Sequence, residues 1–288
     1  MSRQLLPIAL ALACGLAGCS RSGSSAPTAP GSPPASPGVP QPNQMQMAGT
    51  VSDSAFRPLG GATVEVLDGP QAGKTTTADA SGQFSLSGTF DDTTRFRATK
   101  EGHVAATGTL QPHCAPCNPN RWIHFYLPPL VPSANIAGHY TLTFTADGAC
   151  AALPSAVRTY AATLVPVTTS HHPAGTFYEG TVSGAEFLQG YNSFSIGVAG
   201  DYFTGWFGDL HGDPGLVEQV APTTYFALGG EVAGSVTGGS TVTGSLDGFI
   251  DSCELASAMG PRYSCSPGPA AIRAQCNSRN HRLTLTRR

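Results

Sequence analysis

The residue types best suited to chemistry in this chain gather around Cys114 and Cys117, two cysteines separated by two residues and preceded by His113. Such a pair can be a redox centre, half of a metal site or a structural disulfide. A redox pair needs an acidified thiol, usually at a helix N-terminus or beside positive charge, but Asn-Pro-Asn follows here and Arg121 is the only nearby cation. A zinc site needs about four ligands, so His113 and His124 would have to converge on the cysteines. We favour the disulfide and keep the metal and redox sites as alternatives.

A second candidate for chemistry is "GDLHGDPG" at 208–215, in which Asp209, His211 and Asp213 alternate. Alternation can turn three ligands the same way, but a calcium-binding loop needs glycine at its sixth place and a bidentate glutamate at its twelfth. Pro214 occupies the sixth place and the glutamate is missing. We interpret this segment as a polar hairpin loop, with the three residues as weak metal candidates.

Other motifs predict no cofactor. "GPQAGKTT" at 69–76 has one residue too few between its glycines for a phosphate-binding loop, and "SHHPAG" at 170–175 is typical of a solvated turn. No hydrolase motif of the types G-x-S-x-G, H-E-x-x-H or S-x-x-K occurs in the sequence. Four carboxylates are expected on strands, where a catalytic pair cannot be distinguished from surface acids without geometry: Glu179, Glu186, Asp201 and Glu231.

The N-terminus indicates where the protein resides. Arg3 precedes an apolar run from Leu5 to Leu16, which is typical of a secretory signal and too short and interrupted to span a membrane. The end of this run, residues 16–19, resembles the lipobox of bacterial lipoproteins. That resemblance implies cleavage after residue 18 and acylation, such as palmitoylation, of Cys19. Two or more acyl chains hold a protein stably on a membrane. Ser20 resembles the sorting residue of outer-membrane lipoproteins; the face of the membrane stays undetermined.

A spacer follows the anchor. Residues 20–44 hold seven prolines, six serines and three glycines, with Arg21 as the only charge. Such a composition cannot form a core, and its reach lies between about 30 Å as a coil and about 80 Å when extended. We therefore predict a linker over residues 19–46.

The composition of the remainder predicts an all-β protein. Charged residues make up 11% of the chain and the formal net charge is −3, so a basic surface for nucleic acid is not expected. The chain has 35 glycines and 24 prolines, and short alternating apolar runs recur between turn residues without a long helical period. A proline-rich connection over 128–134 divides the folded part into two predicted units, 47–127 and 135–288.

The first unit reads as a small β-sandwich. Ala62, Val64 and Val66 alternate with polar residues, and Phe84 and Leu86 share one face of a later strand. Residues 47–127 resemble a carboxypeptidase regulatory-like domain of the transthyretin-like type. The resemblance rests on four motifs: Gly49-x-Val51-x-Asp53, Pro58 to Ala62, Asp79-x-x-Gly82-x-Phe84, and Lys100 to His103. It implies a non-catalytic module.

The second unit matches no family that the motifs identify. It contains eight or nine strand-like runs, from "GHYTLTF" at 138–144 to "HRLTLT" at 281–286. A meandering closed barrel and a second sandwich both fit. We favour the barrel, with the last strand pairing with the first, because closure removes exposed sheet edges.

The remaining cysteines predict a disulfide map. Six cysteines remain after the signal and the anchor, and an exported protein meets an oxidising environment. With Cys114 paired to Cys117, barrel closure brings Cys150, after the first strand, near Cys276, before the last. Cys253 and Cys265 then pair within one loop.

Three classes of function remain at this stage. The first is a non-catalytic envelope module that binds an unknown envelope protein or a glycan, or organises the envelope. The second is a carrier of a small ligand inside the barrel, and the third is a hydrolase with an unrecognised site. The oligomeric state is not predicted. The carrier hypothesis draws on the aromatic residues of the second unit: Tyr140, Tyr160, Phe194, Phe203, Trp206 and Tyr225.

Overall fold

The computed structural model describes residues 45–110, 121–150, 157–168, 172, 174–208, 215–254 and 271–288. These residues form strands and connections with no α-helix, as the alternation predicted. No helix among them is long and apolar enough to cross a membrane. The described residues, from 45 to 288, belong to one compact unit.

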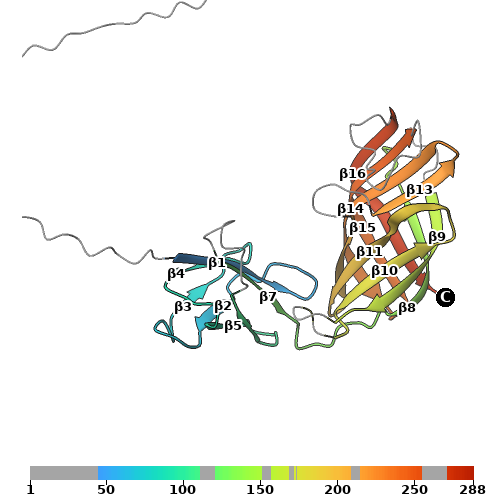
Figure 1. The fold of residues 1–288 in the computed structure, drawn as a ribbon. Coiled ribbons are helices and arrows are strands. Elements are labelled where there is room, and N and C mark those ends of the chain that lie inside the picture. The colour runs from blue at the N-terminus through green and yellow to red at the C-terminus, as the bar shows by residue number, and fades with distance from the viewer. Residues whose placement is uncertain are drawn as a thin grey trace, which may run out of the picture. The chain divides into compact units, whose positions relative to one another are not determined.

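The N-terminal sandwich consists of two sheets, with strand orders β4-β1-β7 and β3-β2-β5-β6 (Figure 1). β1 pairs antiparallel with β4 and parallel with β7. Alternate residues of β1, β2, β4, β5 and β7 enter one core, which includes Val51, Val64, Phe84 and Phe96. The predicted inward set of Ala62, Val64, Val66, Phe84 and Leu86 is buried, which confirms the alternation. The strands are β1 (Met45–Asp53), β2 (Thr63–Val66), β3 (Thr75–Thr77), β4 (Gln83–Gly88), β5 (Arg95–Thr99), β6 (Ala106–Thr109) and β7 (Arg121–Leu127).

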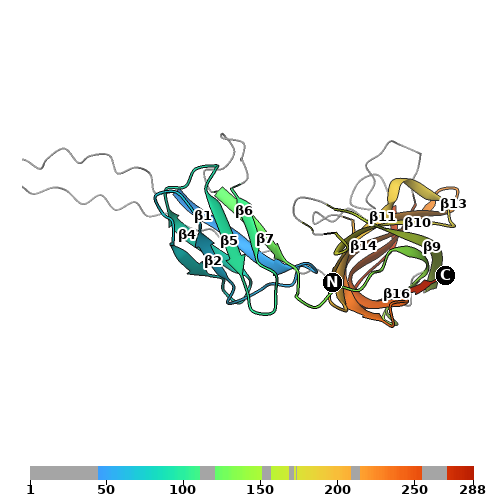
Figure 2. The same cartoon turned by 90° about the horizontal axis from the view of Figure 1, so that it is seen from below.

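The C-terminal domain is a closed barrel of eight strands in the cyclic order β10-β9-β8-β16-β15-β14-β12-β11, seen nearly end-on in Figure 2. β13 lies against β11 and β14 at one end. The last strand pairs with the first, from Arg282 with Thr145 to Arg287 with Tyr140, so the predicted closure is confirmed. The strands are β8 (Gly138–Thr145), β9 (Val157–Pro166), β10 (Phe177–Ser183), β11 (Phe187–Ala199), β12 (Tyr202–Phe207), β13 (Leu216–Ala221), β14 (Thr224–Thr237), β15 (Thr241–Glu254) and β16 (Ala271–Arg287).

Large side chains opposite glycines fill the barrel. Gly180 of β10 is paired with Phe194 of β11, and a Cβ at Gly180 would lie 2.3 Å from the Phe194 ring. Gly244 of β15 leaves the same kind of space for the Phe203 ring. Interiors of eight-stranded barrels are just wide enough for side chains. The glycines therefore decide where the aromatic rings lie inside this barrel.

A tight turn of the sandwich contacts the outside of the barrel. The Asp53 carboxylate accepts hydrogen bonds from the backbone nitrogens of Ala55 and Arg57 and from Arg57 Nε, which holds the turn. Ser54 Oγ donates to the carbonyl of Val198 at 2.6 Å. Asp53, the last residue of the first family motif, thus shapes the turn that meets the second domain.

Phe56 is the centre of this contact. It has φ of +63°, a conformation in which a bulky residue is uncommon. Its ring makes edge contacts with Trp206 at 4.5 Å and with Tyr126 at 5.4 Å between centroids. The linker is attached to the same side of the barrel, because Ala134 N donates to the carbonyl of Gly200 at 2.7 Å.

We predict that Gly197→Ala weakens this contact. The added methyl would lie 2.5 Å from the Phe56 ring and 2.6 Å from the Ser54 carbonyl oxygen, so the turn must shift. Overpacking of this kind costs about 1–3 kcal/mol. Differential scanning calorimetry of the full chain should show the sandwich unfolding at a lower temperature. Gly148→Ala is the matched control, since no heavy atom lies within 4 Å of a Cβ there. Equal transitions for both variants would contradict the prediction.

Candidate binding surface

The predicted long disulfide is present. Cys150 and Cys276 are bonded, with Cα atoms 5.7 Å apart and a sequence separation of 126. Cys253 is also disulfide-bonded, while its predicted partner Cys265 lies outside the described residues. The predicted Cys114–Cys117 staple lies outside them as well. Both short bridges therefore remain predictions.

Several predicted sites fall outside the described residues: Cys19, His113, Asp209, His211 and Asp213. Within the described parts of the chain, no group of three or more His, Cys, Asp or Glu side chains could hold a metal ion.

Four carboxylates were predicted to lie on strands, and two of the four do not. Glu179 lies on β10 and Glu231 on β14, but Glu186 precedes β11 and Asp201 lies in the turn before β12. Gly184 and Gly200 lie close to these two carboxylates in the sequence and have positive φ. They form turns that interrupt the alternating strand pattern at Glu186 and Asp201.

Asp147, Ser278 and His281 have the residue types of a hydrolase triad but a different geometry. Ser278 Oγ donates to Asp147 Oδ2, and Asp147 N donates to His281 Nδ1 at 3.0 Å. The serine thus contacts the carboxylate and not the imidazole that a nucleophile requires. His281 is fully buried, and burial lowers the pKa of its ring although Asp147 opposes the shift. We interpret the trio as a structural hydrogen-bonded link that joins the β8–β9 connection to β16.

The aromatic residues of the carrier hypothesis divide between two environments. Four of the six lie in the barrel core: Tyr140, Tyr160, Phe194 and Phe203. Trp206 lies on the outer face, because its neighbours Gly205 and Phe207 share the inward face, and it contacts Phe56. Tyr225 belongs to a separate small cluster with Val217 and Cys253. Two of the six aromatic residues on which the carrier hypothesis draws, Trp206 and Tyr225, therefore lie outside the barrel core.

One end of the barrel holds a buried ion pair. Arg158 Nη2 lies 2.6 Å from Glu218 Oε2, and Tyr160 donates its hydroxyl to the same oxygen at 2.7 Å. Burial, together with Glu218, raises the pKa of the Tyr160 hydroxyl. The Arg158 guanidinium also lies 5.2 Å from the centre of the Phe226 ring. Every charge here has a partner, so the arrangement is suited to packing and not to proton transfer.

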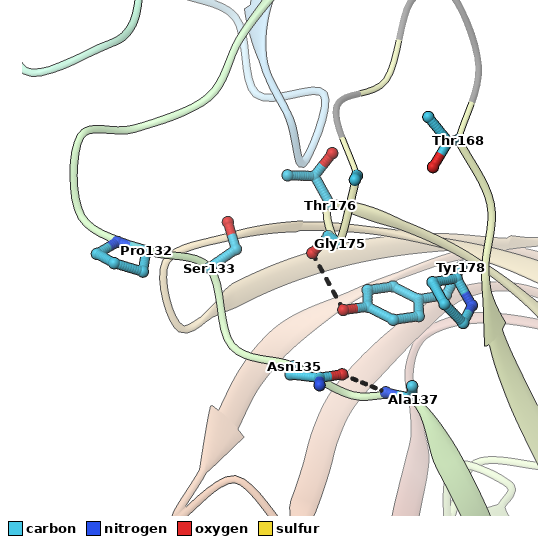
Figure 3. Close-up of a pocket in the computed structure, with 10 residues that line it drawn as sticks. Pro132, Ser133, Asn135, Ala137, Thr168, Gly175, Thr176 and Tyr178 are labelled. Atoms are coloured by element: carbon cyan, nitrogen blue, oxygen red, sulfur yellow. Dashed lines mark hydrogen bonds between the residues drawn. The ribbon is translucent and has the colours of Figure 1, made fainter.

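The other end carries an open cavity of about 540 Å³, lined by the segment before β8 and by the β9–β10 connection (Figure 3). Three of its polar side chains already form hydrogen bonds within the protein. Tyr178 donates to the carbonyl of Gly175 at 3.0 Å, Asn135 Oδ1 accepts from Ala137 N, and Ser133 Oγ donates to the carbonyl of Val198. A small-ligand site needs polar groups that converge on the ligand.

The outer face of the sheet β4-β1-β7 presents a row of rings. Trp122, His124 and Tyr126 alternate with the buried Ile123, Phe125 and Leu127 along β7. Centroids are 5.7 Å apart for Trp122 and His124 and 6.5 Å for His124 and Tyr126, whose ring planes are 12° from parallel. Tyr126 reaches the Phe56 and His172 rings.

We call Trp122, His124 and Tyr126 the aromatic row. The outward residues beside them on the sheet are small and uncharged. The register places Ala48 beside both Trp122 and Ser85, and Thr50 beside His124. Thr50 Oγ1 lies 2.7 Å from His124 Nδ1. None of the outward side chains that the structure describes on this sheet is Asp, Glu, Lys or Arg: Ala48, Thr50, Ser52, Gln83, Ser85, Ser87, Trp122, His124 and Tyr126. Lys74, at the margin, donates to the carbonyl of Ser87.

A hollow of about 380 Å³ adjoins Trp122. Trp122, Ala48 and Ser85 form one side, and β3 with the following turn forms the other. Asp79 lies in that turn, where its Oδ1 accepts from Ser81 N, Ser81 Oγ and Gln83 N. Bonds from Ser81 and then Gln83 lower the pKa of Asp79, so the carboxylate stays ionised. All three of these bonds go to Oδ1 of Asp79, so none of them uses its Oδ2. The remaining lining is Thr76, Thr77, Gln83 and Phe84.

None of the sequence motifs described above indicates this surface. The segment "RWIHFYL" at 121–127 is rich in apolar residues, which indicates a strand. Its two interleaved sets, Trp-His-Tyr and Ile-Phe-Leu, were visible at a spacing of two, which indicates that both faces of the strand carry large rings or apolar groups. That pattern could have shown that one aromatic set lies outside the core.

Comparison with known proteins supports the class of the first domain. Residues 46–113 match the family model of the carboxypeptidase regulatory-like domain, which confirms the resemblance over those residues. No curated protein sequence matches the chain. A solved structure from Bacteroides fragilis NCTC 9343, described as membrane-associated and of unknown function, aligns over 84% of this chain and 97% of that chain at 12% identity. Its TM-score of 0.21 is too low to carry an argument about fold or function.

Proposed function

We propose that this chain is a non-catalytic, lipid-anchored module of a bacterial cell envelope, in the outer membrane, that binds another envelope component. The observation that carries the binding role is the uncharged outer face of β4-β1-β7 with its aromatic row and adjoining hollow. A contiguous surface patch of partly exposed rings marks an interaction surface more often than scattered apolar residues do. The lipobox-like end of the signal, Leu16 to Cys19, supports the anchor, and the proline-rich linker supports a domain held away from the membrane.

The geometry favours a module over an enzyme. In the trio of Asp147, Ser278 and His281, the serine hydroxyl contacts the carboxylate and not the imidazole. The buried Glu218 is paired with Arg158. A carrier is the second candidate, supported by the cavity in Figure 3. The barrel core argues against it, because aromatic and aliphatic side chains occupy the interior where a carried ligand would lie.

We predict that Cys19→Ala abolishes anchoring. Without the thiol no acyl chain can be attached, and the chain should leave the membrane fraction or accumulate as unprocessed precursor. Fractionation with metabolic labelling by a palmitate analogue measures both. Cys14→Ala is the matched control, since this cysteine lies within the predicted signal peptide. Continued acylation and membrane association of Cys19→Ala would show the lipoprotein assignment to be wrong.

A further inference from the structure

We infer that the outer face of β4-β1-β7 binds a neutral glycan, with a pyranose ring in the hollow beside Trp122 and the chain continuing along the aromatic row. This inference rests on the proposed function as a binding module and names its ligand class. Three features carry it: the rings of the face, the polar groups of the adjoining hollow, and the lack of cationic side chains among the described outward residues of the sheet.

The rings suit the amphipathic shape of a sugar. A pyranose has an apolar face of C–H groups and a polar edge of hydroxyls, so it stacks on an aromatic ring while its edge stays hydrated. Trp122 is half-buried and His124 is exposed, and Ala48, the strand neighbour of Trp122, is too small to cover the indole. The spacing of 5.7 Å between the centroids of Trp122 and His124 lets successive units of one chain meet these two rings. Tyr126, which is half-buried against Phe56 and His172, forms the end of the row.

The polar groups of the hollow suit the hydroxyl edge. Asp79 Oδ2 can accept from two hydroxyls, the Gln83 side chain both donates and accepts, and the hydroxyls of Thr76 and Thr77 do the same. The backbone and Ser81 bonds to Oδ1 hold the carboxylate in place before a ligand arrives. The volume of about 380 Å³ lies within the range of small-molecule sites.

The absence of cationic side chains among the described outward residues of the sheet, together with the ionised Asp79 in the hollow, distinguishes a neutral glycan from other occupants. Single-stranded nucleic acid also stacks on rings but needs a cationic groove for its phosphates. The described outward side chains of this sheet include no Lys or Arg, and Asp79 would repel phosphate or uronate groups. Protein interfaces are depleted of Ser and Ala, whereas Ala48, Ser85 and Ser87 lie on this face.

The test uses the full mature chain in detergent. Isothermal titration and intrinsic tryptophan fluorescence are measured with cellohexaose, mannohexaose and chitohexaose, and with polygalacturonate as the anionic comparison. At least one neutral hexasaccharide should bind and change the fluorescence of Trp122. Trp122→Ala should weaken binding by about tenfold or more, the scale of one lost stacking contact. Asp79→Asn, which keeps the Oδ1 acceptor, and Thr77→Ala should also weaken it.

The matched control is Thr107→Ala, an exposed threonine on β6 of the opposite sheet, which should bind like the unchanged chain. Circular dichroism shows whether each variant is folded. Failure of all three neutral glycans to bind the unchanged chain, or equal binding by Trp122→Ala, overturns the inference. A photoreactive residue at position 122 that crosslinks in whole envelopes to a protein and not to a polysaccharide also overturns it. The anchored module would still stand in these cases if Cys19→Ala leaves the membrane.

Discussion

Replacing Cys150 and Cys276 with alanine is expected to lower the free energy of unfolding of the barrel by about 5 kcal/mol. The bond closes a loop of 126 residues, and the entropy that it removes from the unfolded chain grows with the logarithm of that length. β16 pairs with β8 only over residues 282–287, opposite residues 140–145. Cys276 lies on the part of β16 that precedes this pairing, and Cys150 lies in the connection after β8, so the disulfide joins these two segments.

Urea unfolding of the two single variants and the double variant separates the bond from local packing. Either single substitution already opens the loop, so Cys150→Ala, Cys276→Ala and the double variant should lose nearly the same stability. Losses that add across the two sites would instead assign the effect to packing of the side chains.

The second large effect is expected at the ion pair inside the barrel. Glu218→Gln should destabilise the barrel by about 3 kcal/mol, because it leaves the Arg158 charge without its counter-ion in a site from which water is largely excluded. The Arg158 and Glu218 side chains are only 20% and 12% exposed. Tyr160 also loses its charged acceptor.

The same substitution at an exposed pair provides the control. Glu65 and Arg97 lie on the outer face of the sandwich with side chains 33% and 47% exposed, so Glu65→Gln should cost under about 1 kcal/mol. The double variant Glu218→Leu with Arg158→Met should recover most of the loss, since apolar replacements of a buried pair are often tolerated. Equal costs for Glu218→Gln and Glu65→Gln in chemical unfolding would show that the barrel pair is effectively solvated.

Local sequence features predicted the architecture well. Alternation of apolar and polar residues is a property of neighbouring residues, and it predicted the strands and the buried set of the sandwich. The expected positions of Cys150 after the first barrel strand and of Cys276 before the last predicted their bond, because closure makes those strands neighbours. Cys276 in fact lies within the last strand, because β16 begins at Ala271. The same reasoning failed at Glu186 and Asp201, where glycine-containing turns interrupt the pattern.

The candidate site could not be obtained in this way. Alternation separates the residues of a strand into two sets, but both sets of "RWIHFYL" are bulky, and only the packing of β7 against the second sheet shows which set is outside. The hollow needs Trp122 of β7, Ser85 of β4 and Asp79 of the β3–β4 turn together. Those residues are up to 43 positions apart in the sequence.

What the sequence alone predicted correctly is therefore the all-β architecture, a small sandwich followed by a closed barrel. The export signal and the lipid anchor at Cys19 remain predictions. Tertiary structure decided which side chains meet. It put Glu218 inside the barrel with Arg158, Trp206 outside it against Phe56, and Trp122 on an open face. The physical reason is that strand formation depends on neighbouring residues, whereas burial depends on which face of each strand another sheet covers.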